Sequence, residues 1–81
     1  MDLRIAANAI AETLAAVGEA PDGILYAGLA TQGGSIGEFQ AVKTWLLVAG
    51  LATEAPGPVL VATPRLIAIH KKARDRLGRS G

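Results

Sequence analysis

The fold is decided by residues 35–62, which read SIGEFQAVKTWLLVAGLATEAPGPVLVA. Ser35 followed three residues later by Glu38 has the spacing of a capping box, in which the two residues satisfy free backbone N–H groups at a helix start. Apolar residues recur at helical spacing over residues 36–49, and Gly50 is typical of a helix end. These signals predict a helix over residues 36–49.

The sequence pattern changes after this helix. Leu51-Ala52-Thr53 is short and partly β-branched, Pro56-Gly57-Pro58 is typical of a turn, and Val59-Leu60-Val61-Ala62 is typical of a strand. Two strands joined by such a turn form a β-hairpin. Because an isolated hairpin is only marginally stable in water, we expect its strands to pack on the helices.

Helical periodicity is also found on both sides of this segment. It predicts a first helix over residues 2–17 and a short helix over residues 24–31, with the turn Pro21-Asp22-Gly23 between them. A last, basic helix is predicted over residues 64–77, followed by a short tail over residues 78–81. The expected fold class is mainly α with a small β-hairpin (α+β), in the order helix, helix, helix, strand, strand, helix. All 81 residues form one domain, because a chain of this length holds a single core. The helical positions expected to face that core are Leu3, Ala6, Ala7, Ile10, Leu14, Val17, Leu25, Leu29, Phe39, Val42, Leu46, Leu66, Ile69, Ala73 and Leu77.

The third helix and the hairpin resemble the winged helix-turn-helix family. The resemblance is carried by the apolar positions Phe39, Val42 and Leu46 and by the junction that follows them. In that family the third helix ends with a leucine, three further residues and a glycine-leucine pair that leads into the first strand of the wing. Here these are Leu46, Leu47-Val48-Ala49 and Gly50-Leu51.

This resemblance covers roughly residues 3–63 and implies a winged-helix domain that binds double-stranded DNA. In the family the third helix enters the major groove, and the hairpin contacts phosphate or the minor groove. Because most members bind DNA, a small and dimeric DNA-binding regulator of transcription is the first functional expectation. Gln40 and Thr44, on the outward face of the third helix, have side chains that can hydrogen-bond to base edges.

Charge is divided unevenly along the chain. Residues 1–64 contain two cations and six carboxylates, a net charge of −4, whereas residues 65–81 contain six cations and one carboxylate, a net charge of +5. Such an asymmetry indicates a contact site for phosphate or for an acidic partner, and it is equally compatible with a solvated helix face. The candidate phosphate-contacting residues are Lys71, Lys72, Arg74, Arg76 and Arg79.

The expected wing departs from the pattern of DNA-binding proteins. Residues 54–58 contain no basic side chain, although affinity for DNA depends largely on neutralising phosphates with Lys and Arg. The third helix offers Lys43 as its one cation and carries Glu38 at its start. Binding of DNA through the third helix and the wing is therefore weakly supported by charge.

The alternative is a protein-binding adaptor or inhibitor on the same fold, of the kind carried by phages and mobile elements. The third helix is apolar on more sides than one core can cover, and exposed apolar patches usually mark protein interfaces. Trp45 is the strongest candidate, because Trp is over-represented among interface hot spots; its other interpretation is a core residue beneath the last helix. A homodimer that buries such side chains is the expected assembly, and an assembly piece with a basic, solubilising helix is a third possibility. The candidate interface residues are Ile5, Trp45, Leu47, Val48 and Ile67.

No pattern in the sequence indicates an enzyme. His70 is the only histidine and lies in a basic stretch, Ser35 is expected to cap a helix, and the carboxylates are scattered singly. The chain has no cysteine, which excludes disulfides and cysteine-ligated metal sites. We therefore expect no catalytic residue, cofactor or metal. Polar residues interrupt the alanine-rich N-terminal segment, so we expect neither a signal peptide nor a membrane span, and a cytoplasmic location.

Overall fold

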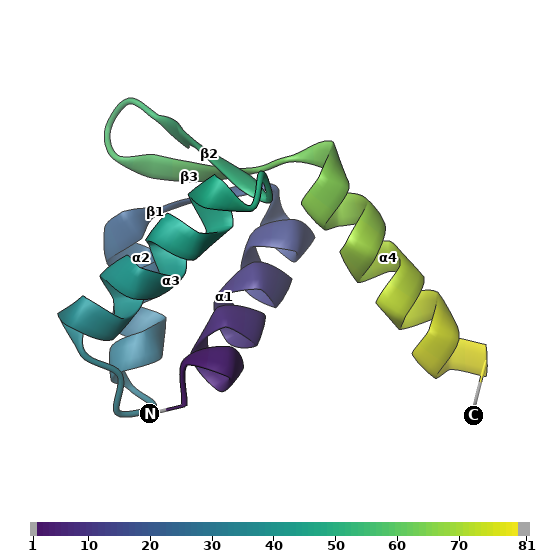
Figure 1. Ribbon diagram of the computed structural model, residues 1–81, viewed down its shortest axis with the longest axis horizontal. Helices are drawn as coiled ribbons and strands as arrows, with labels where there is room; N and C mark the ends of the chain where they lie inside the picture. The colour runs from purple at the N-terminus through teal and green to yellow at the C-terminus, as the bar shows by residue number, and fades with distance from the viewer. Residues whose placement is uncertain (1, 80–81) are drawn as a thin grey trace.

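Three helices lie beneath a small antiparallel sheet, and a fourth helix slants away from them (Figure 1). The computed structural model describes residues 2–79, and of residues 74 and 76–79 it describes the backbone alone. The arrangement confirms the expected α+β class, mainly helical with a small sheet. The elements in chain order are α1 (Leu3–Val17), β1 (Glu19–Pro21), α2 (Asp22–Ala30), α3 (Ile36–Val48), β2 (Ala52–Ala55), β3 (Val59–Ala62) and α4 (Pro64–Arg79).

The sheet contains one strand more than the sequence predicted. β1 pairs antiparallel with β3, with Ala20 opposite Leu60, and the strand order is β1-β3-β2. The expected turn at Pro21-Asp22-Gly23 is therefore wrong, since Pro21 ends a strand and Asp22 begins α2. A three-residue strand that contains proline has little intrinsic β propensity, so it is the pairing with β3 that makes it a strand. Proline is tolerated there because β1 lies at an edge of the sheet.

Local signals set the boundaries of the longer helices. Asp2 caps α1 by accepting a hydrogen bond of 2.8 Å from the backbone N–H of Arg4, and Gly18 ends it with φ of 89°. The predicted capping box at the start of α3 is confirmed. The N–H of Glu38 donates to the Ser35 hydroxyl oxygen at 3.2 Å, and the N–H of Ser35 donates to the Glu38 carboxylate at 2.8 Å.

The core lies between the helices and the inner face of the sheet. Leu14 of α1, Leu46 of α3 and Leu60 of β3 are its largest fully buried side chains. Each therefore connects a different element to the same centre, and truncation of such a leucine to alanine typically costs about 2–5 kcal/mol. The remaining buried side chains are Ala6, Ile10, Ala20, Leu25, Leu29, Phe39, Val42, Leu51, Ala52 and Leu66.

Several positions that were expected to face the core are exposed instead. Leu3 and Val17 are 48% and 60% exposed because they lie at the two ends of α1. Ile69 is 52% exposed and Ala73 is also exposed, because the later turns of α4 diverge from α1 (Figure 1). The side chain of Leu77 lies outside the described residues.

The direction of α4 is set where the helix begins. The Thr63 hydroxyl donates to the carbonyl oxygen of Gly50 at 2.8 Å, and its backbone N–H donates to the carbonyl of Leu51 at 3.1 Å. The same hydroxyl oxygen accepts a hydrogen bond of 3.4 Å from the N–H of Leu66, as an N-cap does. These bonds connect the start of α4 to the junction between α3 and β2, and Leu66 then enters the core.

Candidate interaction surface

The outward strip of α3 consists of small, uncharged side chains. Gln40 and Thr44, the predicted base-reading residues, are both exposed on it. Val48, a predicted interface residue, follows Thr44 one turn later and is 82% exposed. The full strip is Gly37, Gln40, Ala41, Thr44 and Val48. It offers hydrogen bonds at two positions and no cation to a ligand.

Lys43, the one cation of α3, is held by two carboxylates from other elements. Its Nζ lies 2.5 Å from Asp22 Oδ2 and 2.7 Å from Glu54 Oε1, and its side chain is 20% exposed. Asp22 begins α2 and Glu54 lies in β2, so the ammonium group connects α3 to both. The other oxygen of Asp22 is buried without a hydrogen-bond partner. The sequence indicated none of these contacts, since the partners lie 21 and 11 residues away.

These two ion pairs stabilise the charged form of Lys43 and engage its ammonium group within the chain. The hydrogen bond to Asp22, followed by the bond to Glu54, raises the pKa of Lys43 above its ordinary value of 10.5. A cation that is already neutralised by two carboxylates contributes little to binding phosphate, because the attraction must compete with the existing pairs. The face of α3 and the wing therefore lack a cation available to a nucleic acid, among the residues described.

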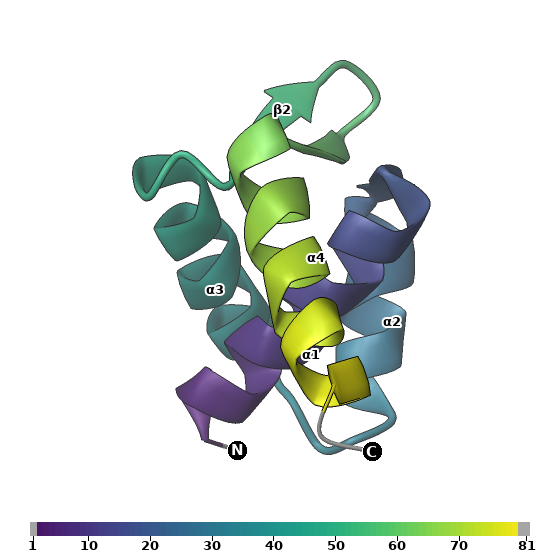
Figure 2. The ribbon, with the colours of Figure 1, turned by 90° about the vertical axis from the view of Figure 1, so that its right-hand side faces the viewer.

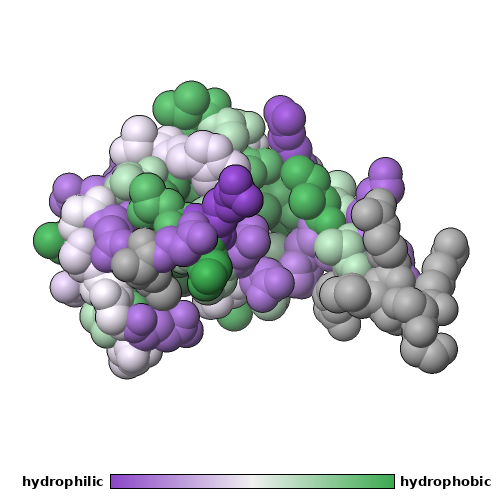
Figure 3. Space-filling view, turned by 60° about the horizontal axis from the view of Figure 1, so that its bottom comes forward, coloured by the Kyte–Doolittle hydropathy of each residue, from purple (hydrophilic) through white to green (hydrophobic). Residues whose placement is uncertain are grey.

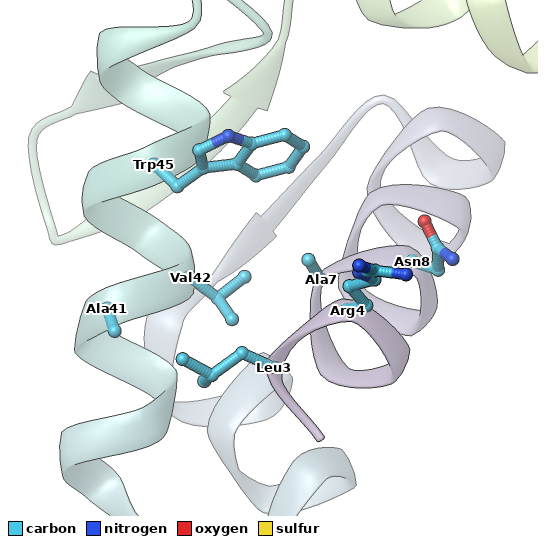
Figure 4. Close-up of a pocket in the computed structure, with 7 residues that line it drawn as sticks. All are labelled: Leu3, Arg4, Ala7, Asn8, Ala41, Val42 and Trp45. Carbon is cyan, nitrogen blue, oxygen red and sulfur yellow. The ribbon is translucent and has the colours of Figure 1, made fainter. Parts of the chain in front are cut away.

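An apolar groove separates α1 from α3. Its volume is about 440 Å³, within the range of ligand-binding clefts. The indole ring of Trp45 extends from α3 over the groove toward α1, above Val42 and Ala7 (Figure 4). Arg4 and Asn8 supply its polar side chains. The lining residues are Leu3, Arg4, Ala7, Asn8, Ala41, Val42 and Trp45.

A second, smaller cleft lies between α1 and α4. It has a volume of about 150 Å³ and includes Ile69 and Ala73, the two α4 positions that the sequence assigned to the core. Its lining residues are Asn8, Ala11, Glu12, Leu66, Ile69, His70 and Ala73. His70 therefore lies between α4 and α1, in the same cleft as Asn8 and Glu12.

The groove and the cleft meet at Asn8, which lines both. The groove and the cleft are here together called the helical valley, in which α1 is the base and α3 and α4 are the walls. Figure 2 shows α4 in front of α1 with α3 to one side. In Figure 3 hydrophobic surface gathers on the right-hand side of the body. Small side chains line the valley, with Ala7 and Ala11 at its base and Ala41 on its α3 wall.

The predicted interface residues do not form one patch. Trp45 is 50% exposed and leans over the valley, so it is not an ordinary core residue. Leu47 is partly buried against the core. Ile67 is 43% exposed on α4, while Ile5 is 58% exposed on a side of α1 that lines neither depression.

The valley contains residues that sequence reasoning missed. Leu3 and Ala7 were assigned to the core, and Arg4 and Asn8 were assigned no role. These four residues form two neighbouring pairs one helical turn apart, which is visible in the sequence. The spacing does not reveal whether another helix covers that side of α1. That depends on the angle at which α4 departs.

The predicted phosphate-contacting residues lie on α4. Lys71 and Lys72 are exposed. The side chains of Arg74, Arg76 and Arg79 lie outside the described residues. Within the described part, the ion pairs observed are those of Lys43, and no group of three potential metal ligands is found.

Comparison with protein family models, with curated proteins and with solved structures finds no match for this chain. No helix among the described residues is both long and apolar enough to cross a membrane.

Proposed function

We propose that this chain is a winged-helix domain that acts by binding a protein through the helical valley, rather than by reading DNA with α3. The fold assignment is supported by the hairpin that directly follows α3 and by the junction between them. There the backbone N–H of Leu51 donates to the carbonyl of Leu46 at 2.9 Å, so the leucine and the glycine-leucine pair form one tight helix end.

The observation that carries this proposal is that Lys43 already forms ion pairs with two carboxylates of its own chain. A recognition helix reads bases with cations or amide side chains that face the duplex. α3 offers the amide of Gln40, but its only cation is bound to Asp22 and Glu54. The valley beside it has the opposite character, with apolar lining and a half-exposed tryptophan. Clefts of this kind, with an aromatic residue at the edge, are typical of protein interfaces.

Duplex DNA is the second candidate, and one observation favours it. Lys71 and Lys72 are exposed on α4, in the segment that carries the chain's excess positive charge. Contacts from such residues would be to phosphate and therefore independent of sequence.

The first experiment measures binding to a fluorescently labelled duplex at about 50 mM and about 200 mM salt, by anisotropy. We expect weak binding with a steep salt dependence. Replacing Lys71 and Lys72 with alanine should remove it, whereas Gln40→Ala and Thr44→Ala should have no effect. Tight, sequence-selective binding that is lost with Gln40→Ala or Thr44→Ala would overturn the proposal.

The second experiment tests the valley with purified protein partners. A partner identified by crosslinking is titrated calorimetrically against the unaltered chain, Trp45→Ala and Ile24→Ala. Ile24 is the matched control, because it is 65% exposed but lies on α2, outside the valley. We expect Trp45→Ala to weaken binding at least about tenfold and Ile24→Ala to leave it unchanged. Equal affinity for all three would contradict the proposal.

A further inference from the structure

We propose that the protein bound in the helical valley is a second copy of this chain, whose α4 lies in the valley while the first copy's α4 lies in the valley of the second. This deepens the proposed function, on which it rests, by naming the partner. The interface would be a two-fold exchange of one helix.

The first support is that α4 buries few of its side chains. Leu66 is the only buried side chain among those described in this helix. Ile69 and Ala73 follow at spacings of three and seven residues, on the side that faces the valley, and both are exposed. Helices of this length usually obtain their stability from packing an apolar face. Of the three apolar side chains described on this face of α4, two are therefore exposed within one chain.

The second support is the shape of the valley. Ala7 and Ala11 at its base and Ala41 on its α3 wall let another helix approach closely, as small side chains do at helix contacts. Trp45 and Ile69 stand on opposite walls, where a helix laid between α3 and α4 would contact both. One inserted helix would thus cover the apolar residues that all three elements contribute to the valley.

The third support is symmetry. In a two-fold dimer the same surface is used by both copies, so each copy gives one helix and receives one. Dimerisation would then bury the exposed apolar face of α4 and the valley of both copies at the same time.

Charge is complementary in the same arrangement. Residues 65–81 carry six cations against one carboxylate, and residues 1–64 carry six carboxylates against two cations. The basic helix of one copy would therefore lie on the acidic body of the other. Within the valley Glu12 can pair with a cation of that helix if the helix keeps clear of Arg4 at the other end. The whole chain has a net charge of only +1, so two copies meet with little overall repulsion.

The test is sedimentation velocity across a range of micromolar concentrations, with circular dichroism to check that each variant is folded. We expect a species of twice the 8.3 kDa chain mass. Trp45→Asp and Ile69→Asp, on the two walls, should each weaken dimerisation at least about tenfold. Ile24→Asp, an equally polar change at an exposed isoleucine of α2, should leave the dimer intact.

Cysteine crosslinking gives an independent readout, since the chain contains no cysteine of its own. Trp45→Cys and Ile69→Cys variants are prepared separately, mixed and oxidised. Because each chain carries one thiol, a mixed disulfide reports a contact between copies. We expect Trp45→Cys to link to Ile69→Cys, and neither to link efficiently to Ile24→Cys.

Two outcomes overturn this inference. One is a monomer at every concentration, and the other is a dimer that survives both wall variants with no preference in crosslinking. If the monomer still binds another purified protein through Trp45, the proposed function stands while the second copy is excluded as partner. If the dimer forms as described but reads DNA through Gln40 and Thr44, the dimer stands and the proposed function fails.

Discussion

At the residue scale, Gly34 is required by a close approach between α2 and the turn that follows it. A Cβ atom added there would lie 2.4 Å from Leu29 Cγ and 3.1 Å from the Leu29 carbonyl oxygen. Leu29 is buried, so it has little room to move. We expect Gly34→Ala to lower the free energy of unfolding by about 1–3 kcal/mol.

The matched control is Gly28→Ala. Gly28 lies inside α2, and an added Cβ would meet nothing within 4 Å. Because alanine restricts the unfolded chain and favours the helix, this change should raise stability by up to about 1 kcal/mol. Urea denaturation of both variants measures the two effects, and a neutral Gly34→Ala would contradict the packing described.

Also at the residue scale, Lys43 holds together two carboxylates that would otherwise share a partly buried site. Lys43→Met leaves Asp22, which is 16% exposed, without its partner. We expect a loss of about 1–3 kcal/mol, between the values typical of exposed and buried pairs. Glu54→Gln, at the more exposed partner, should cost less than about 1 kcal/mol.

A double-mutant cycle checks the cause of this loss. If the uncompensated charge of Asp22 is responsible, adding Asp22→Asn to Lys43→Met should restore part of the stability. Additive effects of the two substitutions, measured by urea denaturation, would show that the ion pair is not the source.

At the scale of one element, the capping box makes the stability of α3 depend on pH. The backbone N–H of Ser35 lowers the pKa of Glu38 below its ordinary value of 4.5 by hydrogen-bonding to the carboxylate. A lowered pKa in the folded state means that this contribution is fully present above pH 4.5 and is lost as the pH falls through the lower value.

The corresponding variant is Glu38→Gln, which retains a hydrogen-bonding side chain but does not titrate in this range. We expect the unaltered chain to be the more stable of the two near neutral pH, with the difference shrinking below pH 4.5. Thermal unfolding from neutral to acidic pH measures it. A difference that stays constant with pH would exclude the carboxylate as its cause.

The elements also differ in how far sequence could predict them. α1 and α3 have caps and apolar spacing within their own residues, so their existence was predicted correctly. β1 was missed because its three residues have no strand signal of their own and become a strand only by pairing with β3, about 40 residues away.

At the scale of the whole molecule, α4 is the element least supported by its own chain. Beyond Leu66 its described side chains are exposed or only partly buried, whereas α1 and α3 each contribute several buried residues. We expect backbone amides of residues 68–73 to exchange with deuterium faster than those of α1 and α3.

The concentration dependence of hydrogen exchange distinguishes a helix that is weakly packed in every state from one that packs only in a dimer. In the proposed dimer, raising the concentration should slow exchange in residues 68–73 of the unaltered chain and leave it unchanged in Trp45→Asp. Exchange in α4 that is already slow at the lowest concentration would show that one chain suffices to stabilise it.

The candidate surface was predicted only in fragments. Trp45 and Val48 were identified from the excess of apolar residues in one helix, and both are exposed. Leu3 and Ile69 were placed in the core, because periodicity shows that residues share a face without showing whether another element covers it.

The sequence alone determined the interactions between near neighbours. Caps, apolar spacing and turn residues act within a few positions, and they predicted four helices and a hairpin. Three features were decided by tertiary structure alone, namely the third strand, the partners of Lys43 and the valley left open by α4. Each depends on how segments far apart in the chain are packed, and the energy of such contacts depends on distance and burial, which a local pattern does not contain.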